Sequence, residues 1–229
     1  MGVNAVFRRI LTGATLSLLS LMCFTGETAA TPLDRSIMSV VVEKTPTAKL
    51  TSQIILVIDH NLSLWSKQAD GRWTMELESY CGYGKNGFSA DRHEGDKTTP
   101  IGAFPILYAF GLVDNPGTEM SYRQVTPQSY LSGEEATYNQ WVESERPLEY
   151  SEHLIDYYQY KYAMNIGFNV DPTVLGRGAA IFLHCKSTDR WWTAGCVSVP
   201  EEVMLKLLQR TRNGAYIVIA PSIEELANI

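Results

Sequence analysis

The sequence predicts a mainly β domain with a few short helices. Three observations predict it: several β-branched apolar runs of strand length, an Asp-Gly turn signal between two of them, and few segments with helical spacing. The 229 residues suit one catalytic-size domain, and 45% hydrophobic with 19% charged residues excludes a disordered chain or a coiled coil. The net charge of −6 is opposite in sign to that of a nucleic-acid-binding protein, so we expect no nucleic-acid partner.

The strands are expected in a clear order along the chain. A β-branched run at 54–58 predicts a buried strand, and alternating apolar residues at 62–66 predict its neighbour. The Asp70-Gly71 turn signal follows, so we expect a hairpin with the next apolar run. The remaining strands are expected at 73–77, 101–110, 160–168, 179–184 and 216–220.

The chain is expected to begin with a signal peptide at residues 1–30. Two arginines precede a mostly apolar run of fifteen residues at 10–24, and small residues follow as a cleavage site. The run falls short of the ~20 residues needed to span a bilayer, so we expect export without stable membrane insertion; an uncleaved anchor is the alternative. Two prolines and little periodicity then predict a linker at 31–50, ahead of one domain at 51–221 and a C-terminal tail at 222–229.

One segment differs in composition from the rest. Residues 111–160 carry nine acidic residues against two arginines, a net charge of −7, and seven of the twelve tyrosines. We expect an inserted segment that covers a cleft as a lid and attracts a cationic group. The alternative is a solvated excursion that keeps the protein soluble.

A helix is expected directly after Cys196. Ser198 and Glu201 have the spacing of a capping box, apolar residues then recur four apart, and the helix ends near residue 213. The N–H groups at such a helix start favour a thiolate, and Gly195 leaves room for backbone N–H groups to bind a substrate oxyanion. Cys196 is therefore a candidate nucleophile.

A histidine is placed to act with this cysteine. His184 ends an apolar strand, where its imidazole can take a thiol proton or hold it as an ion pair. The structural alternative is a small buried cysteine and a hydrogen-bonded histidine. Zinc bound by His184, Cys185 and Cys196 is disfavoured because neighbours on a strand point to opposite faces, and we expect no cofactor. Three cysteines follow the signal peptide: Cys81, Cys185 and Cys196. Because this number is odd and Cys196 is the candidate nucleophile, any disulfide is expected to join Cys81 and Cys185.

The sequence resembles the L,D-transpeptidase catalytic domain family. Its signature of a histidine, a loop and a Gly-Cys pair is similar to Leu183-His184 followed by Thr193-Ala194-Gly195-Cys196. The resemblance runs from about residue 53 to 220, and it includes the upstream segments Gly82-Tyr83-Gly84 and Lys97–Phe104 and the strand pair at 58–64.

This resemblance implies an L,D-transpeptidase-like β-sandwich or barrel with an inserted lid-like segment, exported to the cell envelope, either cell wall or periplasm. Cys196 would be the nucleophile, His184 the base, and the Cys185 carbonyl would orient the imidazole. The Gly195 and Cys196 N–H groups would form the oxyanion hole. The remaining site residues, implied as substrate-binding, are Thr193, Ser198 and Tyr162.

The implied partners are peptidoglycan stem peptides, and the implied reaction is acyl transfer. The thiolate attacks the carbonyl of the third stem residue, releases D-Ala and passes the acyl group to an acceptor amine, which gives a 3→3 cross-link. Ala194 replaces the second histidine of the signature, Ser198 takes the polar position two after the cysteine, and the histidine-to-cysteine loop is short. The alternatives are therefore an L,D-carboxypeptidase or a peptidoglycan–protein amidase with the same acyl-enzyme, and a non-catalytic wall-binding domain. A papain-like protease is disfavoured because its cysteine precedes its histidine.

Overall fold

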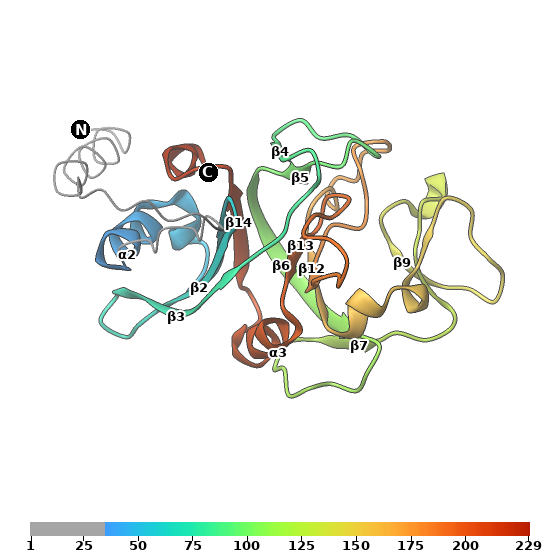
Figure 1. The fold of residues 1–229 in the computed structure, drawn as a ribbon, viewed down its shortest axis with the longest axis horizontal. Coiled ribbons are helices and arrows are strands. Elements are labelled where there is room, and N and C mark those ends of the chain that lie inside the picture. Colours follow the sequence, from blue (N-terminus) through green and yellow to red (C-terminus); the bar gives the residue numbers. More distant parts are fainter. Residues whose placement is uncertain (1–34) are drawn as a thin grey trace.

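The computed structural model describes residues 35–229, so the predicted signal peptide at 1–30 lies outside the described residues. Nine strands form the main sheet: β1 (Gln53–Ile58), β2 (Asn61–Lys67), β3 (Trp73–Tyr80), β6 (Gly102–Gly111), β7 (Tyr122–Gln124), β11 (Ala163–Ile166), β12 (Phe182–Cys185), β13 (Val197–Val199) and β14 (Tyr216–Ala220). Their order is β13-β12-β11-β6-β14-β1-β2-β3, with β7 also paired to β6 (Figure 1).

Helices are few and short. The two α-helices are α2 (Arg35–Lys44) and α3 (Glu201–Arg210), and the 3₁₀ helices are η1 (Pro46–Lys49), η2 (Glu135–Thr137), η3 (Leu154–Asp156), η4 (Tyr158–Lys161) and η5 (Glu224–Asn228). Two small sheets are formed by β4 (Phe88–Ser89) with β5 (Thr99–Pro100), and by β8 (Ser129–Leu131), β9 (Trp141–Glu143) and β10 (Glu152–His153). The predicted mainly β class is confirmed. Within residues 35–229, no helix combines the length and apolarity that a membrane crossing requires.

Strand β1 is apolar at every position because both of its faces are buried. Ile55 and Val57 face the central core, which α3 also contacts, whereas Ile54 and Leu56 face a second core under α2. The strand pairs with β14 on one side and β2 on the other, so it lies inside the sheet. A strand buried on both faces requires a continuous apolar run.

Strand β6 joins the two halves of the sheet. Its residues 102–105 pair with β14, and residues 106–110 pair with β11, where the register shifts between Asn165 and Ile166. A register shift of this kind bends a strand and increases its twist. Strands of both halves contribute to the central core, so the sheet is nearly closed around it.

The predicted linker at 31–50 is corrected by the structure. Residues 35–44 form α2, whose Met38, Val41 and Val42 pack against the sheet with Trp65. The apolar spacing of three and four residues in this short helix buries one face. The expected tail also folds back, because Leu226 in η5 is buried in the same core.

The start of the last helix and the extent of one strand also differ from prediction. Ser198 lies in β13, paired with His184, and α3 begins at Glu201 after Pro200, which has no side-chain cap. The capping box is therefore wrong. The strand predicted at 160–168 is shorter, because residues 158–161 form η4.

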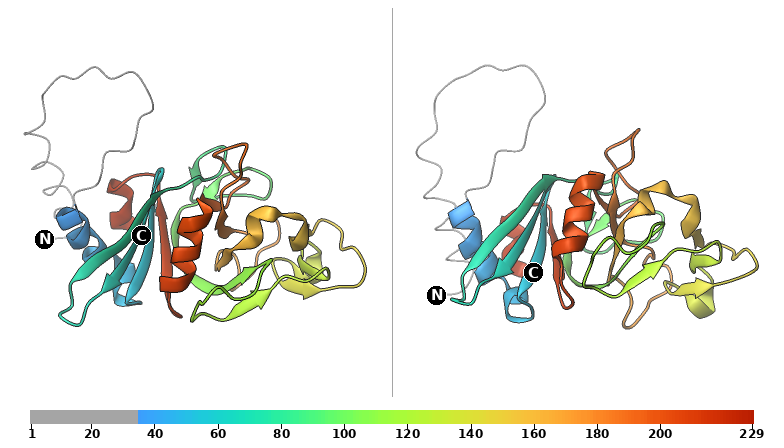
Figure 2. Two further views of the ribbon diagram at one scale, coloured as in Figure 1. Left: turned by 60° about the horizontal axis from the view of Figure 1, so that its bottom comes forward. Right: turned by 90° about the horizontal axis from the view of Figure 1, so that it is seen from below.

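The insertion, residues 111–160, forms a lobe at one end of the molecule. Its small sheet has the order β10-β8-β9, and the views place it at the end opposite α2 (Figures 1 and 2). Its Leu131, Leu154 and Tyr160 share a third core with Phe110 and Phe182 of the main sheet. Part of the insertion is therefore packed against the main sheet.

Candidate active site

A cavity of about 310 Å³ lies at the end of β12, and both members of the expected catalytic pair line it. Cys196 and His184 contribute to its wall. The rest of the wall comes from the loop at 92–97, the insertion at 152–160 and the segment at 179–198. Three parts of the chain thus converge on one site.

The turn that presents Cys196 is held by two threonines. Gly195 has a φ of +144°, which favours glycine, and a Cβ there would lie 2.9 Å from the Thr98 carbonyl oxygen. Thr193 Oγ1 donates to the Cys196 carbonyl (2.6 Å) and accepts from the Gly195 N–H (3.0 Å). Thr99 Oγ1 donates to the Gly195 carbonyl (2.8 Å), so the two sequence motifs meet here.

The loop that contains Gly82 and Gly84 runs along the same turn. Gly82 exchanges two backbone hydrogen bonds with Ser198, of 2.8 and 2.9 Å, and Gly84 forms a bridge with Thr193. A Cβ at Gly82 would lie 1.9 Å from the Trp191 carbonyl oxygen, and a Cβ at Gly84 would lie 2.4 Å from the Lys97 carbonyl oxygen. Only glycine allows the backbone to approach these two segments so closely.

The structure corrects two parts of the expected cysteine environment. The Gly195 N–H is already engaged by the Thr193 hydroxyl, so it is not free to bind an oxyanion in this arrangement. The helix start expected two residues after Cys196 is wrong, because β13 intervenes and α3 begins at Glu201. The dipole of α3 therefore does not act on the thiol, since its effect is confined to the first turn.

The Cys196 thiol is buried and neutral at rest. It donates to the Ala180 carbonyl (3.2 Å) and accepts a hydrogen bond from the Phe182 N–H (3.4 Å). Burial, followed by the nearby Glu152 carboxylate, raises the pKa of this thiol to about 12. A base must therefore remove its proton before it can attack a carbonyl.

His184 has the protonation state of such a base. Its Nδ1 lies 2.8 Å from the Cys185 carbonyl oxygen, which only accepts, so Nδ1 carries the proton. Burial lowers the pKa of His184 to about 4, so the ring is neutral and Nε2 has a free electron pair. The Tyr160 ring meets the imidazole edge to face, with centroids 5.4 Å apart, and fixes its plane.

The insertion also holds the backbone beside the thiol. Ala180 has a φ of +55°, which is costly for an alanine. Its N–H donates to Asn139 Oδ1 (3.1 Å), and Asn139 Nδ2 donates to the carbonyls of Phe168 (3.0 Å) and Asn169 (2.8 Å). The insertion thus fixes the carbonyl that the Cys196 thiol contacts.

The predicted substrate-binding residues divide into two groups. Thr193 and Ser198 line the cavity, although the Thr193 hydroxyl is occupied within the turn. Tyr162 does not line it: its side chain packs against the central core, and Lys161 Nζ lies 5.5 Å from its ring centroid. The Cys185 side chain points into the central core, on the face opposite His184.

Across residues 35–229, no group of His, Cys, Asp and Glu side chains could hold a metal ion, and Cys81, Cys185 and Cys196 are all free thiols.

Two charged residues of the cavity wall that act electrostatically on the Cys196 thiol are absent from the sequence-based site. Glu152 starts the wall contributed by the insertion, and its Oε1 accepts a short hydrogen bond from Tyr160. Arg92 comes from the loop at 92–97 and is 4% exposed. Neither belongs to a sequence motif; the only signals were the acidic excess of the insertion and an arginine in an irregular loop.

Glu152 is expected to make stability depend on pH. Burial raises the pKa of its carboxyl from the ordinary value of 4.5 to about 7. The folded protein therefore binds more protons than the unfolded chain between these values, and stability falls as pH rises through this window. The glutamine of Glu152→Gln stays neutral at every pH. We therefore expect the free energy of unfolding of this variant to exceed that of wild type by about 1–3 kcal/mol at pH 8 and to differ little from it at pH 5.

Thermal unfolding at the two pH values measures this difference. Glu149→Gln is the control, because Glu149 is exposed in the same insertion, and it should leave the thermal stability unchanged at both pH values. An equal shift of Glu152→Gln at pH 5 and pH 8 would contradict a buried, titrating carboxyl.

The comparison with known families decides the family of this chain. The model of the L,D-transpeptidase catalytic domain, YkuD, matches residues 51–219. The chain belongs to the L,D-transpeptidase catalytic domain family. The predicted L,D-transpeptidase-like β fold is thereby confirmed. Among curated proteins, no sequence match was found.

Solved structures of this family are similar at low identity. The helical cell shape determining protein Pgp2 from Campylobacter jejuni is 14% identical with a TM-score of 0.43, over 78% of this chain and 52% of that one. The L,D-transpeptidase C442S mutant from Enterococcus faecium is 15% identical with a TM-score of 0.37, over 75% and 50%. The L,D-transpeptidase from Stackebrandtia nassauensis is 12% identical with a TM-score of 0.37, over 96% and 91%. The chain spans about half the length of the first two.

Proposed function

We propose that this protein is an exported peptidoglycan L,D-transpeptidase of the cell envelope, with Cys196 as nucleophile and His184 as base. The observation that carries the proposal is the cavity itself. It is lined by a thiol and by a neutral imidazole whose Nδ1–H donates a hydrogen bond to the Cys185 carbonyl. General-base activation of a nucleophile requires a neutral imidazole with a free Nε2 in the same site as a protonated thiol, and this cavity is lined by both.

The reaction follows in two balanced halves. His184 Nε2 takes the Cys196 proton as Sγ attacks the carbonyl carbon of the third stem residue. The C–N bond to D-Ala then breaks, and the imidazolium returns the proton to the leaving amine. In the second half, Nε2 takes a proton from an acceptor amine as it attacks the thioester, and Cys196 leaves as thiolate and is reprotonated. The Cys196 N–H remains the backbone donor proposed for the oxyanion.

The products separate this proposal from its alternatives. The protein is incubated with purified muropeptides, and the products are analysed by mass spectrometry. We expect cross-linked dimers that have lost one D-Ala. Tripeptides without dimers would indicate a carboxypeptidase, peptide–protein conjugates an amidase, and unchanged muropeptides a non-catalytic wall-binding domain.

We further propose that the insertion acts as a lid that attracts the acceptor amine. Four of its residues, Glu152, Tyr157, Gln159 and Tyr160, line the cavity, and the segment carries a net charge of −7. Salt screens the attraction between the acidic insertion and a cationic amine, with a screening length of roughly 10 Å at 0.1 M salt. The acceptor amine is cationic, whereas the competing water is neutral. Transfer should therefore weaken relative to hydrolysis as salt rises.

Neutralising Glu145 and Glu149 together should lower the transfer-to-hydrolysis ratio about 2- to 5-fold at low salt, with Cys196 acylation unchanged. Both are exposed, whereas Glu143 is left in place because its carboxylate accepts three hydrogen bonds in the small sheet. The control neutralises Glu43 and Glu225, which are exposed outside the insertion. A ratio that is the same in both double variants would remove the electrostatic role of the insertion.

A further inference from the structure

A buried cation beside the nucleophile has no role in the mechanism above. Arg92 is 4% exposed and lines the cavity, yet its Nε and Nη1 have no hydrogen-bond partner among the described residues. Burying an arginine with unpaired donors is costly in free energy. Buried polar groups without partners are typical of binding sites, where a ligand supplies the missing hydrogen bonds.

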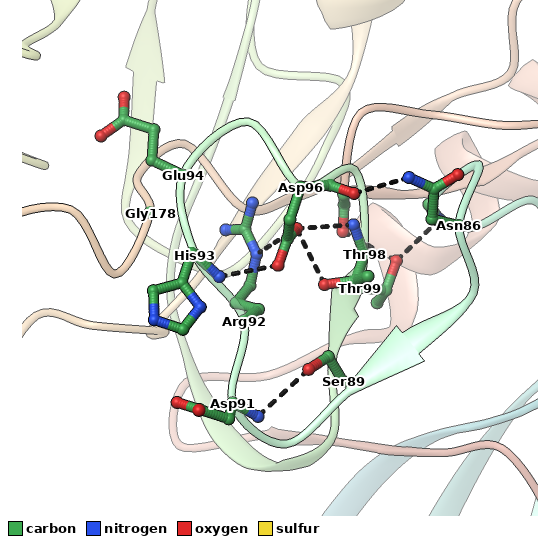
Figure 3. A network of polar contacts seen from close by, with 12 residues as sticks. Asn86, Ser89, Asp91, Arg92, His93, Glu94, Asp96, Thr98, Thr99 and Gly178 are labelled. Carbon is green, nitrogen blue, oxygen red and sulfur yellow. Dashed lines mark hydrogen bonds and ion pairs between the residues drawn. The ribbon is translucent and has the colours of Figure 1, made fainter.

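The loop around Arg92 is built without using the guanidinium. Asp96 organises it by accepting hydrogen bonds from the His93 N–H (2.7 Å), the Thr98 N–H (2.8 Å) and Thr98 Oγ1 (2.9 Å) (Figure 3). Arg92 Nε lies 3.8 Å from Asp96 Oδ1, which is an ion pair and longer than a hydrogen bond. The carboxylate that neutralises Arg92 in part is thus engaged elsewhere.

Two glycines place the guanidinium next to the nucleophile. A Cβ on Gly178 would lie 2.4 Å from Arg92 Nη1, and a Cβ on Gly195 would lie 3.2 Å from Arg92 Nη2. The guanidinium therefore sits between the two glycine backbones, and Gly195 directly precedes Cys196. Phe168 covers it from another side, with its ring centroid 5.5 Å from the guanidinium carbon.

The charge of the cavity is opposite to that of the chain. Three cationic side chains line it, Arg92, Lys97 and Arg190, and only two acidic ones, Glu94 and Glu152. The whole chain, in contrast, has a net charge of −6. The Glu94 carboxylate accepts a hydrogen bond from Tyr138 (2.7 Å). This lining favours an anionic group close to the thiol.

We propose that Arg92 binds the terminal carboxylate of the donor peptide, which belongs to the D-Ala residue that leaves. The proposal rests on the proposed function, because it assigns a part of that substrate to this residue. In a peptide the terminal carboxyl carbon lies about 2.5 Å from the scissile nitrogen, so a carboxylate there is within reach of a cation that flanks the nucleophile. The planar guanidinium presents paired donors to a carboxylate. Arg92 would thereby select donors in which the scissile bond is the last one.

Binding tests this without requiring turnover. Cys196→Ala is titrated with synthetic tetrapeptide stems ending in D-Ala, whose terminal carboxylate is either free or amidated; stems with diaminopimelate and with lysine at the third position are both used. We expect the free carboxylate to bind on the order of 10- to 100-fold more tightly than the amide. Adding Arg92→Met should remove this preference, and Arg92→Lys should retain part of it.

The control is Arg177→Met, because the Arg177 guanidinium carbon lies 5.8 Å from the same Phe168 ring and Arg177 is exposed. It should keep the preference of the parent. Equal or undetectable binding of acid and amide in Cys196→Ala overturns the inference. So does an Arg92→Met variant that folds and loses affinity for both peptides equally, which would make Arg92 structural.

The proposed function is judged separately, by whether wild-type protein forms an acyl adduct on Cys196 with the free-acid donor. An adduct with equal use of acid and amide leaves that function standing and overturns only the role of Arg92. If Arg92→Met does not fold, Arg92→Lys and the comparison of the two peptides decide the question.

Discussion

Replacing Cys196 with alanine is expected to abolish acyl transfer, with a loss on the order of 10⁴-fold or more. Sγ is the atom that forms the thioester, and within the described residues no other cysteine lines the cavity. The rate of D-Ala release from a tetrapeptide donor, followed by chromatography, measures the loss. Labelling of the protein by a carbapenem should disappear as well.

Cys81→Ser and Cys185→Ser are the matched controls. Cys81 Sγ faces the Asp59 carbonyl (3.5 Å) and Cys185 Sγ faces the Tyr162 carbonyl (3.6 Å), both away from the cavity. Each should keep most of the activity of the folded protein. If Cys185→Ser were the inactive variant and Cys196→Ala active, the nucleophile would be assigned incorrectly.

His184→Ala is expected to lower the rate of acylation by 10²–10⁴-fold, the range for loss of a general base. Without the imidazole, the neutral Cys196 thiol has no acceptor for its proton during attack. Burial keeps the pKa of His184 at about 4, so kcat/KM of wild type should stay level on the acid side and fall only near that pH. That acid limb should be absent from the residual activity of His184→Ala.

His93→Ala is the control, because His93 is an exposed residue of the loop at 92–97. It should retain activity close to that of wild type. A large loss in His93→Ala, together with an active His184→Ala, would transfer the role of base to His93.

The sequence was sufficient to predict most of the sheet. Continuous apolar runs identify strands that are buried on both faces, and β1 and β14 are of this kind. It was not sufficient for α2, because a ten-residue helix between two prolines has only a weak periodic signal. The helix cap at Ser198 failed because pairing with Gly82 and His184 overrides the local capping signal.

The site was predictable where its residues are close in sequence. His184 and Cys196 frame one short loop, and both line the cavity. Arg92 and Glu152 come from distant segments, and only tertiary packing brings them to the thiol. The occupied Gly195 N–H could not be foreseen either, since it depends on the direction of the Thr193 hydroxyl within the turn.

Intact-protein mass spectrometry tests the central assignment most directly. Wild-type protein is mixed with a tetrapeptide donor without an acceptor, quenched in acid and digested to locate the adduct. We expect a mass gain equal to the donor minus D-Ala, carried by Cys196 and absent from Cys196→Ala. An adduct on Cys81 or Cys185, or release of D-Ala from Cys196→Ala at the wild-type rate, would contradict it.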